Sequence, residues 1–194
     1  MRLAQRLARA LGWELVPRRK PRDVEAQYVR ALERFGVEVV LDVGANLGQH
    51  GALLREQGWR GPILSFEPIP RVHAALVRRA ASDPLWEVAP AMALGDRDGT
   101  VTLEVSAESD MSSTLPQGPL LRRVSPGSRV VERIEVPLRR LDGLGLVTAR
   151  PWRRLFLKVD VQGAEAAVLA GAAGLEARLV GLRLELPLVP LYEC

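Results

Sequence analysis

The stretch that decides the fold is Val37-Glu38-Val39-Val40-Leu41-Asp42-Val43-Gly44-Ala45-Asn46-Leu47-Gly48. Its first part is mostly β-branched or aliphatic, and it predicts a buried strand over 37–43 that ends at Gly44. The residues after the turn predict a helix over 47–57, which Gly58 ends. A strand, a glycine-containing turn and a helix in this order are typical of the first unit of a parallel α/β sheet.

The alternation of strand and helix continues on the C-terminal side of this stretch. Further strands are expected at 62–66, 86–94, 155–159 and 179–186, and further helices at 70–81 and 163–173. Because these strands are almost continuously apolar, the sequence predicts an α/β fold with a mostly parallel sheet and helices on both faces.

The middle of the chain follows a different pattern. Residues 100–105 and 134–138 alternate with period two, which predicts half-exposed strands, and Pro137 suggests that the second one lies at a sheet edge. Residues 106–129 are rich in Ser, Pro, Gly and Arg and have no sustained period. They predict a long loop, of the kind that compact domains often use as a lid or binding segment.

Composition limits the classes of protein that the chain can be. It has 194 residues, 47% of them hydrophobic, which suits one domain with a sizeable core. The one cysteine, Cys194, excludes an internal disulfide framework and a cysteine-based zinc site. The two histidines, His50 and His73, are expected to be packed or solvated rather than catalytic. No apolar run approaches the about 20 residues that span a bilayer, and the arginine-rich start does not resemble a secretory signal, so a cytoplasmic location is expected.

The positive charge is concentrated at the N-terminus. Residues 1–22 contain seven basic residues and one acidic residue, a net charge of +6, whereas residues 23–194 contain 20 basic and 22 acidic residues, a net charge of −2. Because the body is slightly acidic, nucleic acid is not an expected partner. The sequence divides into a basic helical arm at 1–36 and a domain at 37–194.

The arm is expected to contain an amphipathic helix at 2–12, a basic linker at 16–22 and a second helix at 23–35, with Asp23 as its cap and Gly36 after its end. Three uses remain open for the basic residues. The arm can pack on the domain, make weak contact with an anionic membrane surface, or bind an acidic partner or substrate.

The turn at 44–48 allows three interpretations. A phosphate-binding P-loop needs a Lys and a Ser or Thr after the second glycine, and neither is present. A dinucleotide fingerprint needs glycine where Asn46 stands, which leaves an NAD-dependent oxidoreductase as a weaker alternative. The third interpretation is an S-adenosylmethionine pocket. Asp42 would then hold the amino group of the methionine part, Asn46 would accept a positive φ, and Gly48 would let the helix approach the ligand.

Two further acidic residues follow predicted strands. Glu67 comes directly after the strand at 62–66, where a carboxylate accepts hydrogen bonds from both hydroxyls of a ribose. Asp160 comes directly after the strand at 155–159 and therefore lies at the sheet edge where α/β proteins bind ligands.

Six motifs occur in a characteristic order: DVGANLGQ (42–49), SFEP (65–68), ALGDRDG (93–99), SST (112–114), LRRLD (138–142) and LKVDVQGAE (157–165). With them the chain resembles the FkbM-type S-adenosylmethionine-dependent methyltransferases over about residues 35–193. The resemblance implies a Rossmann-like, class I methyltransferase fold and methylation of a hydroxyl oxygen on a natural product, sugar or similar small molecule. It implies cofactor contacts at Asp42, Gly44, Ala45, Asn46, Gly48, Glu67 and Pro68, and it places Asp160 beside cofactor and substrate. Ser112 and Ser113 either face the substrate, as the resemblance implies, or are ordinary loop residues.

The chain departs from the family in two places. Gln162 stands where the family usually has Glu, on the side where substrate is expected. Members also usually continue for several tens of residues beyond the strand at 179–186, so the C-terminal strands of the sheet are expected to be shortened. A partner chain could complete the sheet, which makes a homo-oligomer possible, or the protein is a degenerate module that binds cofactor or a partner without turnover.

For catalysis, a hydroxyl acceptor must lose its proton, and a carboxylate can take it as general base. Asp160 is the first choice for this role and Glu185, on the neighbouring strand, is the second. The two acids could instead bind Mg²⁺, although nothing in their spacing requires a metal, and none is expected. Arg122, Arg123 and Arg129 could recognise an anionic substrate or form a solvated basic loop.

Overall fold

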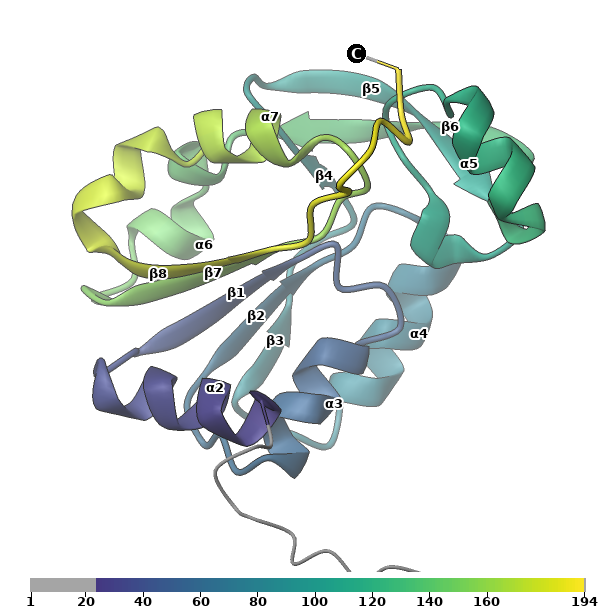
Figure 1. Cartoon of the computed structure of the whole chain (residues 1–194). Helices are drawn as coiled ribbons and strands as arrows, with labels where there is room; N and C mark the ends of the chain where they lie inside the picture. Colours follow the sequence, from purple (N-terminus) through teal and green to yellow (C-terminus); the bar gives the residue numbers. More distant parts are fainter. Residues whose placement is uncertain (1–23, 194) are drawn as a thin grey trace, which may run out of the picture.

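The computed structural model describes residues 24–193, so the expected helix at 2–12, the linker at 16–22, Asp23 and Cys194 lie outside the described residues. Its centre is a parallel sheet of five strands in the order β3-β2-β1-β7-β8 (Figure 1). The strands span Val39–Val43 (β1), Ile63–Phe66 (β2), Trp86–Val88 (β3), Leu155–Val159 (β7) and Leu179–Leu184 (β8). This order confirms the predicted α/β fold.

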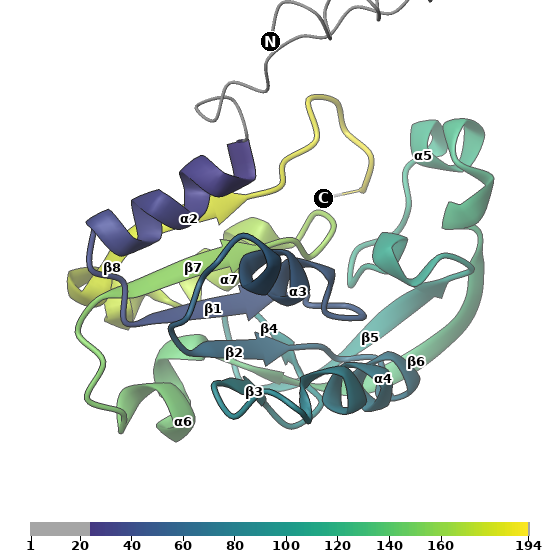
Figure 2. The same ribbon diagram turned by 90° about the horizontal axis from the view of Figure 1, so that it is seen from below.

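Side chains of the central strands alternate between two cores. Val40 packs with the helices α2 (Val24–Arg34), α3 (Gln49–Glu56) and α4 (Pro70–Ala80), which cover one face of the sheet (Figure 2). Val39 and Leu41 pack on the other face, against α6 (Gly145–Thr148), α7 (Glu165–Ala170) and the short turns η4 (Leu141–Gly143) and η5 (Ala173–Arg178). Each fully buried aliphatic side chain of this kind stabilises the fold by roughly 1.5–3 kcal/mol.

A second sheet packs against the start of α4. Its strands are β4 (Ala93–Leu94), β5 (Gly99–Ser106) and β6 (Val130–Arg139), in the order β4-β6-β5. The single strand expected over 86–94 is therefore wrong, because β3 belongs to the main sheet and β4 to the second. Pro90 lies between the two and has no N–H group with which to continue the β3 ladder.

The expectation that Pro137 marks an edge strand is also wrong, because β6 is the middle strand of its sheet. Pro137 lies opposite Thr100 of β5, while β4 is so short that it pairs only with Leu138 and Arg139. Pro137 therefore has a strand beside it on one side only, which is why a residue without an N–H group is tolerated there.

Residues 106–129 do not form one long loop. They contain three short helical segments: η2 (Ser109–Met111), α5 (Pro119–Val124) and η3 (Pro126–Ser128). Six residues are too few for α5 to display a helical period, but Pro119 at its first position is a start signal that sequence reading can use. The first part of this segment, residues 109–114, contributes to the pocket that lies at the carboxyl ends of the main strands.

The helix α2 is part of the domain. Val29 and Leu32 are buried in the same core as Val40, and Glu25 forms an ion pair with Arg183 of β8 at 2.9 Å. Residues on both sides of the boundary expected at residue 37 therefore share one core, and the helix ends near Gly36 as predicted. In the part of the chain that the structure describes, no helix is long and apolar enough to cross a membrane.

Candidate active site

Two adjoining pockets lie where the strand order reverses. β1 has β2 on one side and β7 on the other, and the crevice between the ends of β1 and β7 is where open α/β sheets bind ligands. The pockets have five lining residues in common: Gly44, Asn46, Asp110, Asp160 and Gln162. A ligand that extends from one pocket into the other would therefore pass the ends of both strands.

Gly44 brings the two strand ends together. Its φ is +71°, and a Cβ atom there would lie 1.8 Å from the carbonyl oxygen of Asp160. The close approach lets the N–H group of Asp160 donate to the carbonyl oxygen of Val43 at 3.1 Å. Gly44 is therefore required by backbone packing, independently of any ligand.

The turn after Gly44 uses its N–H groups internally. Gly44 and Ala45 both donate to the carbonyl oxygen of Phe66, at 3.1 and 3.0 Å. Asn46 has a φ of +47°, as its residue type suggested, and its N–H group donates to Glu67 Oε2 at 2.9 Å. Its side-chain oxygen accepts a hydrogen bond from the hydroxyl of Ser109 at 3.1 Å, which ties the segment over the pocket to the turn.

Glu67 is a buried carboxylate that lines the first pocket. Burial raises its pKa to about 7, although the N–H groups of Ile69 and Asn46, each 2.9 Å from one carboxylate oxygen, oppose the shift. Each oxygen has accepted one hydrogen bond and has a second lone pair left. The group can therefore still accept two hydrogen bonds from a ligand.

The walls of the first pocket around Glu67 are mainly apolar. They include Phe66, Pro68, Met92, Leu94 and Leu103. A pocket with apolar walls and one carboxylate that accepts a pair of hydrogen bonds suits a flat ring joined to a diol, as in a nucleoside.

Asp42 belongs to a row of polar side chains across the sheet. It lies opposite Ser65 of β2 and Lys158 of β7, and Lys158 lies opposite Arg183 of β8. Lys158 Nζ is 3.2 Å from Asp42 Oδ1 and donates to the carbonyl oxygen of Gly44 at 3.1 Å. Burial alone would raise the pKa of Asp42, but the charge of Lys158 and the contact with His50 outweigh it and lower the pKa to about 2.

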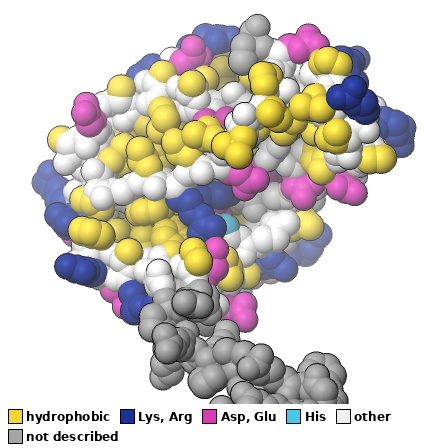
Figure 3. Space-filling view, viewed as in Figure 1, with side chains coloured by type: hydrophobic (Ala, Val, Ile, Leu, Met, Phe, Trp, Pro, Cys, Tyr) yellow, Lys and Arg dark blue, Asp and Glu magenta, His cyan; other side chains and the backbone are white. Residues whose placement is uncertain are grey.

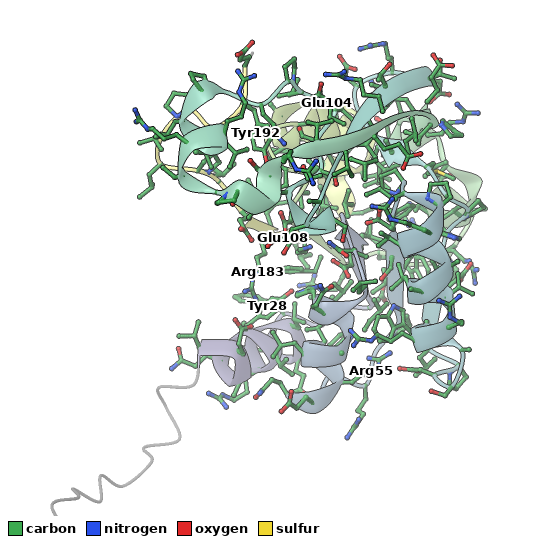
Figure 4. The ribbon with its side chains drawn as sticks, turned by 90° about the vertical axis from the view of Figure 1, so that its right-hand side faces the viewer. Tyr28, Arg55, Glu104, Glu108, Arg183 and Tyr192 are labelled. Atoms are coloured by element: carbon green, nitrogen blue, oxygen red, sulfur yellow. The ribbon has the colours of Figure 1, made fainter. Side chains whose placement is uncertain are left out.

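Residues of α3 line one side of the second pocket, and α2 contacts this helix through Tyr28. His50 lines this pocket, and its Nδ1 lies 3.3 Å from Asp42 Oδ1 while its Nε2 lies 3.3 Å from the hydroxyl of Tyr28. The guanidinium of Arg183 lies 4.9 Å from the centre of the Tyr28 ring, and Figure 4 shows these two side chains next to each other. Burial raises the pKa of Tyr28, so its hydroxyl keeps its proton.

Acidic and basic side chains line the second pocket together. Asp110, Asp160 and Glu185 line the second pocket together with Lys158 and Arg183. In the space-filling view, basic side chains and a histidine meet acidic side chains near the middle of this face (Figure 3). The charge of Asp160, together with burial, raises the pKa of Glu185. Among residues 24–193, no group of three or more His, Cys, Asp or Glu side chains is arranged to hold a metal.

Most of the predicted site residues come together at the two pockets, although their individual roles stay predictions. The residues that line a pocket are Gly44, Ala45, Asn46, Glu67, Pro68, Ser112, Asp160, Gln162 and Glu185.

Three predicted site residues do not line either pocket. Asp42 is fully buried, and its Oδ1 lies 3.2 Å from Lys158 Nζ. The space beside Gly48 is filled by Leu76 and Trp86, so this glycine serves helix packing. Ser113 is buried and donates to the carbonyl oxygen of Gln162 at 2.7 Å.

Sequence reading missed several pocket residues. Lys158 carried a usable signal, because a lysine within an apolar strand needs a buried partner, and Asp42 lies at the matching position of the first strand. The contribution of Asp110 carried no such signal, because it depends on how an irregular segment folds over the sheet.

The order of the parallel strands, the helices on both faces and the pocket at the ends of β1 and β7 define a Rossmann-like α/β domain of the class I methyltransferase type. The family model described as "Methyltransferase FkbM domain" matches residues 42–183, and the chain therefore belongs to the FkbM methyltransferase family. Searches of curated proteins and of solved structures returned no significant match.

Proposed function

We propose that the protein is an S-adenosylmethionine-dependent O-methyltransferase that acts on a hydroxylated small molecule. The observation that carries the proposal is the position of Glu67 in an apolar pocket that continues past Asp160 into a second, polar pocket. The first pocket suits the nucleoside of the cofactor. The second, which is polar and open, suits the acceptor.

The described residues fit this cofactor. Glu67 has two free lone pairs for the ribose hydroxyls, and Phe66, Met92 and Leu94 offer apolar contacts to the adenine. A dinucleotide fits less well, because a pyrophosphate needs free N–H groups at the turn. Those of Gly44, Ala45 and Asn46 are already used.

When bound, the cofactor supplies an electrophilic methyl group on a sulfonium, whose carbon–sulfur bond breaks as the acceptor oxygen attacks. The protein must hold the acceptor oxygen in line and remove its proton. Asp160 lies at the junction of the two pockets, and we assign the proton to its carboxylate. Lys158 Nζ lies 3.7 Å from Asp160 Oδ2, on the same side of the second pocket.

We expect the affinity for S-adenosylhomocysteine to fall by about tenfold between pH 8 and pH 6. The ionised form of Glu67 accepts the hydrogen bonds of the ribose, and its pKa of about 7 means that most of it is protonated at pH 6. Calorimetric titration at several pH values measures the effect. Glu67→Gln serves as the control, because it should bind weakly at every pH. An affinity that stays constant from pH 6 to pH 8 would remove Glu67 from the ligand contacts.

Asp160→Asn tests the assignment of the base. We expect turnover to fall by at least about 10²-fold, because an amide cannot take the proton, while binding of S-adenosylhomocysteine changes little. Transfer of a radiolabelled methyl group to a panel of sugars, hydroxylated polyketides and lipid head groups provides the assay. Asp110→Asn, which removes another carboxylate of the same pockets, is the matched control and should lose less than about tenfold.

The same panel decides between an enzyme and a degenerate module. Methyl transfer to any hydroxyl acceptor supports the proposal. Binding of S-adenosylhomocysteine with no transfer to any member of the panel would favour a module that binds cofactor without turnover.

A further inference from the structure

Tyr192 lies against the loop that carries Asp160. Its hydroxyl donates to Gln162 Oε1 at 2.9 Å, and its ring packs on Gly163, where a Cβ atom would come within 2.9 Å of the ring. The side chain is buried, and Figure 4 shows it near the second sheet, away from Tyr28 and Arg183. Tyr192 does not line either pocket, so any effect on the reaction must pass through the pocket residues that its hydroxyl contacts, which are Gln162 and, at the longer distance of 3.4 Å, the carbonyl oxygen of Met111.

The hydrogen bonds have a fixed direction. Burial raises the pKa of Tyr192 to about 12, so its hydroxyl keeps its proton and acts as a donor. Gln162 Nε2 donates to Asp160 Oδ1 at 2.8 Å, because a carboxylate oxygen can only accept, and Gln162 Oε1 therefore faces the hydroxyl of Tyr192. Without the phenol, the amide could rotate and lose this orientation, because its oxygen and nitrogen ends have nearly the same shape.

The backbone of Gln162 is also held in an unusual conformation. Its φ is +58°, which is unfavourable for a residue with a side chain and persists only where the surroundings enforce it. Ser113 donates to its carbonyl oxygen at 2.7 Å, and Glu165 accepts the N–H group of Gly163 at 3.1 Å. The loop is therefore fixed on both sides of the amide that contacts Asp160.

We propose that Tyr192 is a positioning residue for methyl transfer, because through the amide of Gln162 it fixes the orientation of the Asp160 carboxylate that accepts the proton. The proposal rests on the proposed function, in which Asp160 is the base. It also gives Gln162 a role that a carboxylate could not fill in the same way, because only the amide carries a donor for Asp160 and an acceptor for Tyr192 at once.

Tyr192→Phe is a clean variant for the test. The backbone beside it is held by two hydrogen bonds, from Gly118 N to Leu191 O at 2.8 Å and from Glu193 N to Pro116 O at 2.9 Å. Neither bond involves the phenol, so the ring should stay in place when only the hydroxyl is removed.

The experiment is a cycle of Tyr192→Phe, Gln162→Leu and the double variant. With an acceptor found in the panel above, we expect Tyr192→Phe to lower kcat by about five- to tenfold and to change the KM for S-adenosylmethionine by less than about twofold. If Tyr192 acts through Gln162, the double variant should be no slower than Gln162→Leu alone. The side-chain amide resonances of Gln162 in the full chain should shift in Tyr192→Phe.

The outcomes separate the two claims. Losses of kcat that multiply in the double variant, or Gln162 amide resonances that do not move in Tyr192→Phe, would contradict the positioning role. A wild-type protein that transfers no methyl group would contradict the proposed function, and the role of Tyr192 in transfer would fail with it.

Discussion

Lys158→Met is expected to destabilise the protein by about 3–5 kcal/mol at neutral pH, because it leaves a carboxylate buried without its cation. Asp42 is fully buried, and its Oδ1 lies 3.2 Å from the ammonium that the substitution removes. Methionine has a similar length and fills the space, so the loss reports on charge more than on volume. Urea unfolding of the wild-type protein and the variant measures the difference.

The loss should depend on pH in a definite direction. In the wild-type protein the pKa of Asp42 is lowered from 3.8 to about 2, so its favourable contribution is complete above about pH 4 and is lost as the pH falls towards 2. In Lys158→Met, the effect of burial on Asp42 is opposed only by the remaining contacts of this carboxyl. The pKa of Asp42 in the folded variant should therefore rise above 3.8, and the free energy of unfolding of the variant should fall as the pH rises. The difference between the two proteins should therefore be smaller at pH 5 than at pH 8.

A second substitution tests whether the buried charge is the cause. Asp42→Asn combined with Lys158→Met removes both charges and should recover most of the lost stability. Arg150→Met is the matched control, because Arg150 pairs with Glu87 at 2.8 Å on the surface, where such pairs contribute about 0–1 kcal/mol. Equal losses in Lys158→Met and Arg150→Met would contradict the account of this pair.

Gly44→Ala is expected to have the second large effect, a loss of at least about 3 kcal/mol of stability together with weaker binding of S-adenosylhomocysteine. The new Cβ would lie 1.8 Å from the carbonyl oxygen of Asp160, and neither atom can rotate away, because the backbone fixes the position of both. The ends of β1 and β7 must then separate, which breaks the hydrogen bond from Asp160 N to Val43 O and moves Asp160.

Gly58→Ala is the matched control for this prediction. Gly58 also has a positive φ, +101°, but an added Cβ would meet nothing within 4 Å. Gly58→Ala therefore places a side chain at a positive φ, as Gly44→Ala does, but without a steric clash. Thermal unfolding and ligand titration of both variants compare them, and similar results for the two would show that the contact with Asp160 does not matter.

The sequence was sufficient to predict the main sheet, because its strands are short apolar runs bounded by glycine, proline or acidic residues. Two expectations were wrong, the edge position of Pro137 and the single strand over 86–94. In both places, strand pairing depends on which distant strand lies alongside. Local patterns cannot encode that choice, because β4 has only two residues.

The candidate site also contains residues that the sequence could predict and residues that it could not. Gly44, Glu67 and Asp160 follow strands that are adjacent in the sheet, so the parallel fold alone brings them together. Tyr192 and Ser109 reach the site through segments without regular structure, and nothing in their local sequence indicates it. Gly48 illustrates the converse, since a glycine that fits a ligand motif was needed for contact with Leu76 and Trp86.

The most direct test of the central claim, that this is an S-adenosylmethionine-dependent methyltransferase, is calorimetric titration of the full chain with S-adenosylhomocysteine and, separately, with NAD. We expect saturable binding of S-adenosylhomocysteine that weakens in Glu67→Gln, and no binding of NAD at the same concentrations. Binding of NAD without binding of S-adenosylhomocysteine would contradict it.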